Sequence, residues 1–326
     1  MKRLIPLLAF LALAAAQNLS LETALGKAAS QAPVVSAKAE LDDAQAALQR
    51  VLADPLLTRP GRVQAEQRVA LAQASYTRAL RQAEGSIAGA YAQVLEANLQ
   101  NRLAQQSLKL AETNLQVAQI RQKNGSGTAL DVKNAQNRLE DARRQAGLAE
   151  SGFALAQSNL RSLVGAFAAL DPLAKLPEPP GPEAVKGYLE ANPDLLQARQ
   201  RAELARLQVE LLDPSYAARA DIDAARARAE QAQAGAREVE RALALQYDQL
   251  YNQLVSASRA LGVSRAAVEN AREQLAADRK RLEGGLISPI AYAQSELALT
   301  QAELAAQQAV GNYLRAYYNL LTGGGR

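Results

Sequence analysis

The chemistry open to this chain is limited by the residues it lacks. Among its 326 residues there is no His, no Cys and no Trp. Imidazole, thiolate and the usual transition-metal ligands are therefore missing, and an enzyme built here would depend on carboxylates, Lys, Ser or Tyr. No nucleophile, base and orienting group come together at a recognisable spacing, and no G-x-x-x-x-G-K-[ST] phosphate-binding motif occurs. The sequence therefore predicts a protein that is not an enzyme and that binds no cofactor and no metal ion.

Two short glycine turns are the strongest candidates for a functional surface. They are Gly125, Ser126, Gly127 and Thr128 in the first half of the chain, and Gly285, Leu286, Ile287 and Ser288 in the second. One interpretation is structural: a Gly ends one helix at positive φ, and Thr128 or Ser288 caps the next. That interpretation leaves the apolar side chains of Leu286 and Ile287 in an exposed turn, which favours the docking of a partner.

Other polar residues have plainer interpretations. Asp131 follows the first turn and is a candidate channel constriction if several copies form a ring; the alternative is a solvated carboxylate in the first turn of a helix, where negative charge is favourable. Five tyrosines are predicted to pack in helix seams or near the middle of the molecule: Tyr247, Tyr251, Tyr313, Tyr317 and Tyr318.

The N-terminal residues are typical of a secretory signal peptide. Lys2 and Arg3 precede an apolar run that ends in three Ala residues at position 16. The run is shorter than the roughly 20 residues that a membrane-spanning helix needs. We therefore expect residues 1–16 to be removed and the chain to be exported to the cell envelope, in the periplasm or at the outer membrane. The net charge of +4 is spread over interleaved acidic and basic residues, which argues against a nucleic-acid partner.

The composition predicts long helices. Ala occupies 71 positions, and Leu, Gln, Glu and Arg supply much of the rest, all of them strong helix formers. Pro and Gly gather at a few places, so we expect helices over residues 21–52 with an interruption at Pro33, over 62–122 and over 128–164. The segment from Asp171 to Pro182 contains five Pro and is predicted to be an extended linker.

The second half repeats the first. Ala32-Pro33 recurs as Asn192-Pro193, Asp54-Pro55 as Asp213-Pro214, and Gly125 as Gly285, each about 160 residues later. We divide the chain into a signal peptide at 1–16, a first helical repeat at 17–166, a Pro-rich linker at 167–181 and a second helical repeat at 182–326. In each repeat two short helices, end to end, match the length of one long helix and can run antiparallel to it.

Each long helix carries apolar residues with coiled-coil spacing. In the second half Leu243, Tyr247, Leu250, Leu254, Ala257 and Leu261 alternate steps of four and three. In the first half a second line, Leu103, Leu110 and Val117, runs beside a similar stripe. A widened stripe suits a helix with a neighbour on each side, as in the wall of a tube, although an ordinary bundle with two seams would also produce it.

These features resemble the outer-membrane efflux protein family, the TolC-like exit ducts. The resemblance rests on residues 19–25 (LSLETAL), on Asn192-Pro193-Asp194-Leu195, and on the two glycine turns with the helices that follow them. It implies an all-α fold of two tandem repeats of long antiparallel coiled-coil helices that form part of an α-helical tube, or α-barrel. It also implies a homotrimer whose glycine turns face a periplasmic adaptor protein coupled to an inner-membrane pump.

The chain departs from the family in two places. Where the family inserts two membrane strands in each half, this chain has only residues 54–61 and 213–220. A membrane strand needs about 9–11 residues, so we expect the β-barrel strands to be missing and the outer membrane to be reached directly or through another protein. In addition, Ala291 in the second half takes the place of Asp131.

Two functions remain open at this point. The favoured one is a passive efflux duct component of a tripartite export system. The alternative is a periplasmic coiled-coil spacer that bridges envelope layers without conducting anything.

Overall fold

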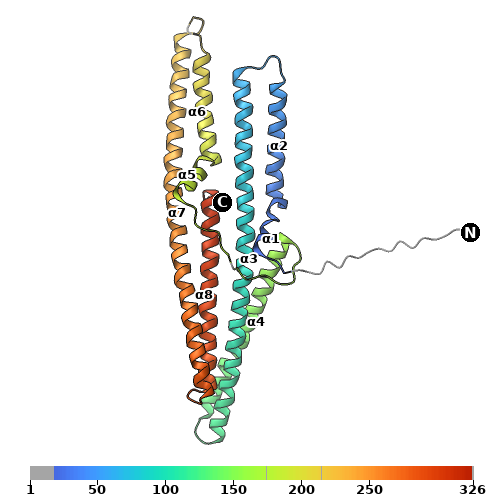
Figure 1. The fold of residues 1–326 in the computed structure, drawn as a ribbon, viewed down its shortest axis with the longest axis vertical. Coiled ribbons are helices and arrows are strands. Elements are labelled where there is room, and N and C mark those ends of the chain that lie inside the picture. The colour runs from blue at the N-terminus through green and yellow to red at the C-terminus, as the bar shows by residue number, and fades with distance from the viewer. Residues whose placement is uncertain (1–17, 174, 214, 325–326) are drawn as a thin grey trace, which may run out of the picture.

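The computed structural model describes residues 18–173, 175–213 and 215–324, and these residues form a set of long helices (Figure 1). The predicted signal peptide lies outside the described residues. The helices are α1 (Leu21–Leu25), α2 (Ala32–Leu52), α3 (Arg59–Lys123), α4 (Ala129–Val164), α5 (Pro182–Glu190), α6 (Pro193–Leu211), α7 (Arg219–Glu283) and α8 (Pro289–Thr322), with a 3-10 turn, η1, at Ala28–Ser30. The predicted all-α fold is confirmed for these residues, in which the one β-type pairing is an isolated bridge between Leu19 and Leu170.

The helix boundaries fall close to the predicted ones, with one difference near the N-terminus. The predicted single interruption at Pro33 is longer in the structure, where α1 ends at the Gly26 cap and α2 begins only after an extended Gln31. Pro33 itself lies in the first turn of α2. Its missing N–H costs little there, because the first N–H groups of a helix have no partner within the helix.

Each half of the chain has one long helix flanked by two shorter helices placed end to end. α3 and α7 have 65 residues each, which is roughly 100 Å at 1.5 Å per residue. α2 and α4 run antiparallel to α3, and α6 and α8 run antiparallel to α7 (Figure 1). The junction of the first pair is hydrogen-bonded, since Gln31 Nε2 at the start of α2 donates to Leu163 O near the end of α4 at 2.7 Å.

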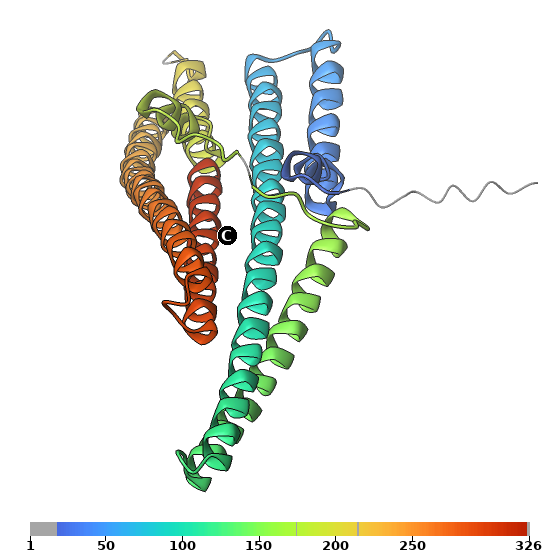
Figure 2. The same ribbon diagram turned by 60° about the horizontal axis from the view of Figure 1, so that its bottom comes forward.

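The helices form a wall that is mostly one layer thick. Toward the glycine turns the order across the wall is α4, α3, α8 and α7, so that α4 and α7 are its edges (Figures 1 and 2). α3 therefore has a neighbour on each side, as its two stripes predict. Leu103, Leu110 and Val117 are nevertheless only half-buried, because both faces of a single layer are open to water.

A second layer covers one face of this wall near its middle, and it contains α1, η1, α5 and the linker. The fully buried Tyr91 of α3 contacts Leu19 O at 2.8 Å and Asp171 O at 2.6 Å through its hydroxyl. The hydroxyl of Tyr313 on α8 donates to Pro177 O of the linker. The tyrosines predicted to pack do so: Tyr247, Tyr313 and Tyr318 are buried, and Tyr251 and Tyr317 are half-buried.

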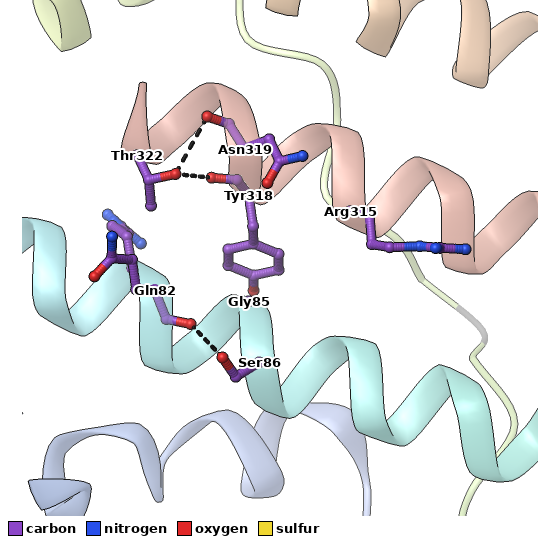
Figure 3. A pocket seen from close by; sticks show the side chains of 8 residues that line it. Gln82, Gly85, Ser86, Arg315, Tyr318, Asn319 and Thr322 are labelled. Carbon is purple, nitrogen blue, oxygen red and sulfur yellow. Dashed lines mark hydrogen bonds between the residues drawn. The ribbon is translucent and has the colours of Figure 1, made fainter. Parts of the chain in front are cut away.

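The close approach of α3 and α8 joins the two halves. A Cβ placed on Gly85 would lie 2.8 Å from Tyr318 Cβ, and Figure 3 shows the Tyr318 ring over Gly85. Only a residue without a side chain fits this contact. The same two helices meet again where Gly311 faces Ala92.

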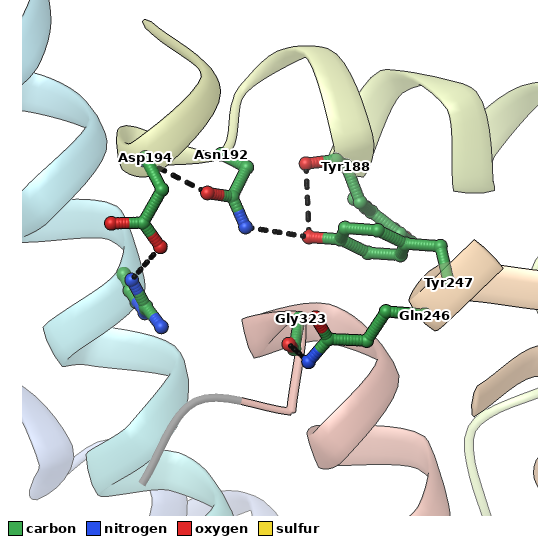
Figure 4. A network of polar contacts seen from close by, with 7 residues as sticks. Tyr188, Asn192, Asp194, Gln246, Tyr247 and Gly323 are labelled. Atoms are coloured by element: carbon green, nitrogen blue, oxygen red, sulfur yellow. Dashed lines mark hydrogen bonds and ion pairs between the residues drawn. The ribbon is translucent and has the colours of Figure 1, made fainter. Parts of the chain in front are cut away.

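A polar network holds the start of α6 against α7 (Figure 4). Asn192 caps α6 by accepting from Asp194 N at 2.9 Å, and its Nδ2 lies 3.5 Å from Tyr247 Oη. Tyr247 in turn donates to Tyr188 O at 3.1 Å. Asp194 also pairs with Arg78 of α3 at 3.3 Å, so the network reaches across to the first half.

Two short connections lie at the end of the molecule away from the glycine turns. Residues 53–58 join α2 to α3, and residues 212–218 join α6 to α7. Their described residues form turns and no strand. Of the helices described here, none combines the length and apolar character that a membrane crossing requires.

Candidate functional site

The first glycine turn ends α3 with a Schellman motif. Gly125 has φ +74°. Its N–H donates to Gln122 O at 3.0 Å, and Ser126 N donates to Arg121 O at 2.9 Å. These bonds satisfy carbonyls that the end of a helix leaves without a partner, and Gly is favoured because other residues rarely adopt this φ.

The same turn begins α4 with a capping box. Thr128 Oγ1 accepts from Asp131 N at 3.1 Å, and Asp131 Oδ2 accepts from Thr128 N at 2.8 Å. The backbone and side-chain hydrogen bonds from Thr128 lower the pKa of Asp131. Within one chain, Asp131 therefore serves its own helix start, and a role in a constriction would require neighbouring copies.

The second turn has the same framework. Gly285 has φ +70°, its N–H donates to Leu282 O at 2.9 Å, and Leu286 N donates to Arg281 O at 2.8 Å. Ser288 Oγ accepts from Ala291 N at 3.2 Å and so caps α8. Both turns thus have the cap geometry of the structural interpretation.

The caps do not account for the apolar side chains at the turns. Leu286 is 79% exposed, and Ile287 beside it is half-buried. Leu130, two residues beyond the first turn, is 65% exposed, although the sequence analysis did not single it out. An apolar residue in the solvent-facing first turn of a helix is the signal that could have identified it. Each turn therefore presents an apolar side chain to water.

A buried carboxylate near the second turn is the other residue that the sequence analysis missed. Asp278 of α7 is 7% exposed and accepts hydrogen bonds from Gln274 Nε2 at 2.9 Å, Ser295 Oγ of α8 at 2.7 Å and Arg281 Nη1 at 3.1 Å. These donors, Gln274 first, lower its pKa. The equivalent positions of the first hairpin are Ala118 and Ala135. Asp at a seam position of α7 was the available signal.

Both glycine turns lie at the same end of the molecule. The α3–α4 turn and the α7–α8 turn each form the tip of a separate helical hairpin (Figures 1 and 2). Neither tip is covered by another described part of the chain. The molecule thus has one end made of two capped hairpin tips.

Comparison with known proteins shows what this architecture is similar to. Residues 58–166, which span α3, the first turn and α4, match a family model described as outer membrane efflux protein. The resemblance to the outer membrane efflux protein family is confirmed. A search of curated proteins found no match to the chain.

The fold of nearly the whole chain is similar to that of solved membrane channels. The match to CusC, a protein with crystal structures that concern folding and transmembrane channel formation, has a TM-score of 0.64 and 14% identity over 93% of this chain and 94% of that chain. The match to the outer membrane protein VceC of Vibrio cholerae has a TM-score of 0.61 and 18% identity over 94% and 96%. The match to the Campylobacter jejuni CmeC outer membrane channel has a TM-score of 0.63 and 10% identity over 93% of this chain and 86% of that chain. The described helices therefore have the fold of the helical part of TolC-like efflux channels.

Proposed function

We propose that this protein is the passive duct component of a tripartite efflux system in the cell envelope. The observation that carries the proposal is a one-layer helical wall with two open edges and with both glycine turns at one end. The match to the outer membrane efflux protein family over residues 58–166 supports it. The duct would work with a periplasmic adaptor and an inner-membrane pump, and it would reach the outer membrane directly or through another protein.

Closure of the wall into a tube requires further copies of the chain. The edge helix α4 exposes Leu148 and Leu155, and the opposite edge helix α7 exposes Leu245 and Val263. Leu148 lies 19 residues after the start of α4 at Ala129, and Val263 lies 20 residues before the end of α7 at Glu283. Both are therefore about 30 Å from the turn end. Two different patches at matching height can form a heterologous contact that closes into a ring, here a homotrimer.

We assign adaptor docking to the two turns, residues Gly125 to Thr128 and Gly285 to Ser288. Leu286→Asp or Ile287→Asp should leave folding intact and abolish adaptor coupling, because a charge at an exposed tip costs little until a partner buries it unpaired. Gly285→Val should instead lower the melting temperature, since a β-branched residue is strained at positive φ. Thermal melting measures the effect on folding, crosslinking measures binding to the adaptor, and drug susceptibility of cells measures export.

The control for these variants is Leu56→Asp, which places the same charge on a highly exposed leucine at the opposite end of the molecule. It should melt and crosslink to the adaptor like the natural protein. If the charged tip variants do the same, the turns are caps only, and a non-conducting periplasmic spacer becomes the better description.

A further inference from the structure

The two faces of the helical wall differ in charge. We call the face that carries the linker and α5 the covered face, and the opposite one the open face. Tyr91 of α3 and Tyr313 of α8 both contact the linker and so mark the covered face. On a helix, residues half a turn away from these positions point to the open face.

The covered face carries ion pairs that run across three helices. Arg102 of α3 pairs with Glu303 of α8, and Arg272 of α7 lies 3.9 Å from the same carboxylate. Lys109, seven residues after Arg102 on α3, is exposed on the same side. Charged side chains are thus a regular feature of this face.

The open face of α8 is a stripe of amides and alanines. Steps of four and three connect exposed residues that lie opposite Tyr313, namely Gln294, Ala298, Gln301, Ala305, Gln308 and Asn312. Gln308 Nε2 donates to Glu96 Oε1 of α3 at 3.0 Å, which places Glu96 beside this stripe.

The neighbouring helices continue the pattern. α3 presents Gln93, Gln100 and Asn114, and α7 presents Gln253, Ala260, Ala267 and Gln274 at intervals of seven. The α7 line starts at Gln246, which donates to Gly323 O at the end of α8 at 2.7 Å. The lines end at Arg121 and Arg281 next to the turns.

Away from the turns, these lines of α3, α7 and α8 have almost no net charge. Between Gln93 and Asn114 of α3, along α8 and from Gln246 to Gln274 of α7, the charged residues of this face are Glu96 and Arg315, which have opposite signs. Arg121 and Arg281 lie beyond these stretches, next to the turns. Figure 3 shows Arg315 with Ser86 and Asn319 around a shallow pocket of about 330 Å³ on this face.

A closed tube has less room inside than outside, so we expect the second layer on its outer side. We propose that the open face lines the duct and that its amide-rich stretch, away from the turns, passes hydrophilic solutes of either charge without electrostatic selection. The proposal rests on the duct function above. A wall of one sign would instead concentrate counter-ions by about tenfold or more.

Single cysteines test the position of the face, because the natural chain has none. Gln301→Cys and Gln253→Cys place a thiol on the open face, and Lys109→Cys places one on the covered face. In the purified oligomer a small maleimide should label all three variants. A bulky polyethylene-glycol maleimide should label Lys109→Cys readily and the other two only after the oligomer is dissociated.

The charge of the wall is tested with two small methanethiosulfonate reagents, one cationic and one anionic. Their rates at Gln301→Cys, each divided by the rate with a free thiol, should agree within about twofold, since a neutral wall concentrates neither ion. The matched controls add Ala305→Glu or Ala305→Lys one turn away. These should favour the cationic and the anionic reagent respectively.

The outcomes separate the two proposals. An oligomer in which the bulky reagent reacts equally fast at Gln301→Cys and Lys109→Cys overturns the assignment of the open face. An oligomer that protects Gln301→Cys but discriminates between the reagents by about tenfold or more overturns the neutral wall. A protein that sediments as a monomer at all concentrations overturns the duct itself.

Discussion

Tyr91 ties three parts of the chain together through one hydroxyl group. It is fully buried on α3 and contacts the carbonyls of Leu19 and Asp171. Tyr91→Phe should lower the free energy of unfolding by about 1–2 kcal/mol, because a buried carbonyl loses its hydroxyl donor. Denaturant unfolding measures the loss. Tyr216→Phe, at a tyrosine that is 90% exposed, is the control and should change nothing.

The same residue makes stability depend on alkaline pH. Burial raises the pKa of Tyr91 to about 12 from the ordinary value of 10.0. The unfolded chain therefore releases this proton first, and stability falls as the pH rises from about 10 to about 12. Tyr91→Phe should show a smaller loss over this range in unfolding measured at several pH values. Part of the loss should remain, because burial also raises the pKa of Tyr318 to about 12. An unchanged pH profile would contradict the assignment to Tyr91.

At the scale of elements, the contact of α3 with α8 depends on one glycine. A Cβ on Gly85 would lie 2.8 Å from Tyr318 Cβ and 3.1 Å from Cγ, so Gly85→Ala must push the helices apart. We expect it to destabilise the protein by about 1–3 kcal/mol in thermal or denaturant unfolding. Gly89→Ala on the same helix meets nothing within 4 Å and should stabilise by up to about 1 kcal/mol. Equal effects at the two positions would refute the close-contact explanation.

At the scale of the whole molecule, the open edges predict self-association. Leu148→Asp and Val263→Asp should each weaken the oligomer at least about tenfold in dissociation constant, because a charge would be buried without a partner. Leu148→Lys combined with Val263→Asp should recover part of the loss if these edges meet. Sedimentation equilibrium measures each variant. A compact, stable monomer of the natural protein at micromolar concentration would rule out closure through these edges.

Local sequence determined the helices and the turns. The positive φ of Gly125 and Gly285, the Thr128 and Ser288 caps and the long stretches free of Pro are all consequences of neighbouring residues. Coiled-coil spacing also predicted the buried line from Leu243 to Leu261 on α7. Such features depend on groups a few positions apart, so their energetics are contained in short segments of sequence.

Tertiary structure alone decided what lies between segments distant in the sequence. Gly85 and Gly89 look alike in the sequence, yet only Gly85 faces Tyr318, more than 200 residues away. Asp278 is buried because Ser295 of the next helix satisfies its carboxylate. Likewise, the position of the linker decides which side of α3, the charged one or the amide-rich one, belongs to the covered face. The Gly85 contact, the burial of Asp278 and the two sides of α3 all depend on how each helix is rotated about its axis relative to its neighbours. Packing across the wall decides that rotation.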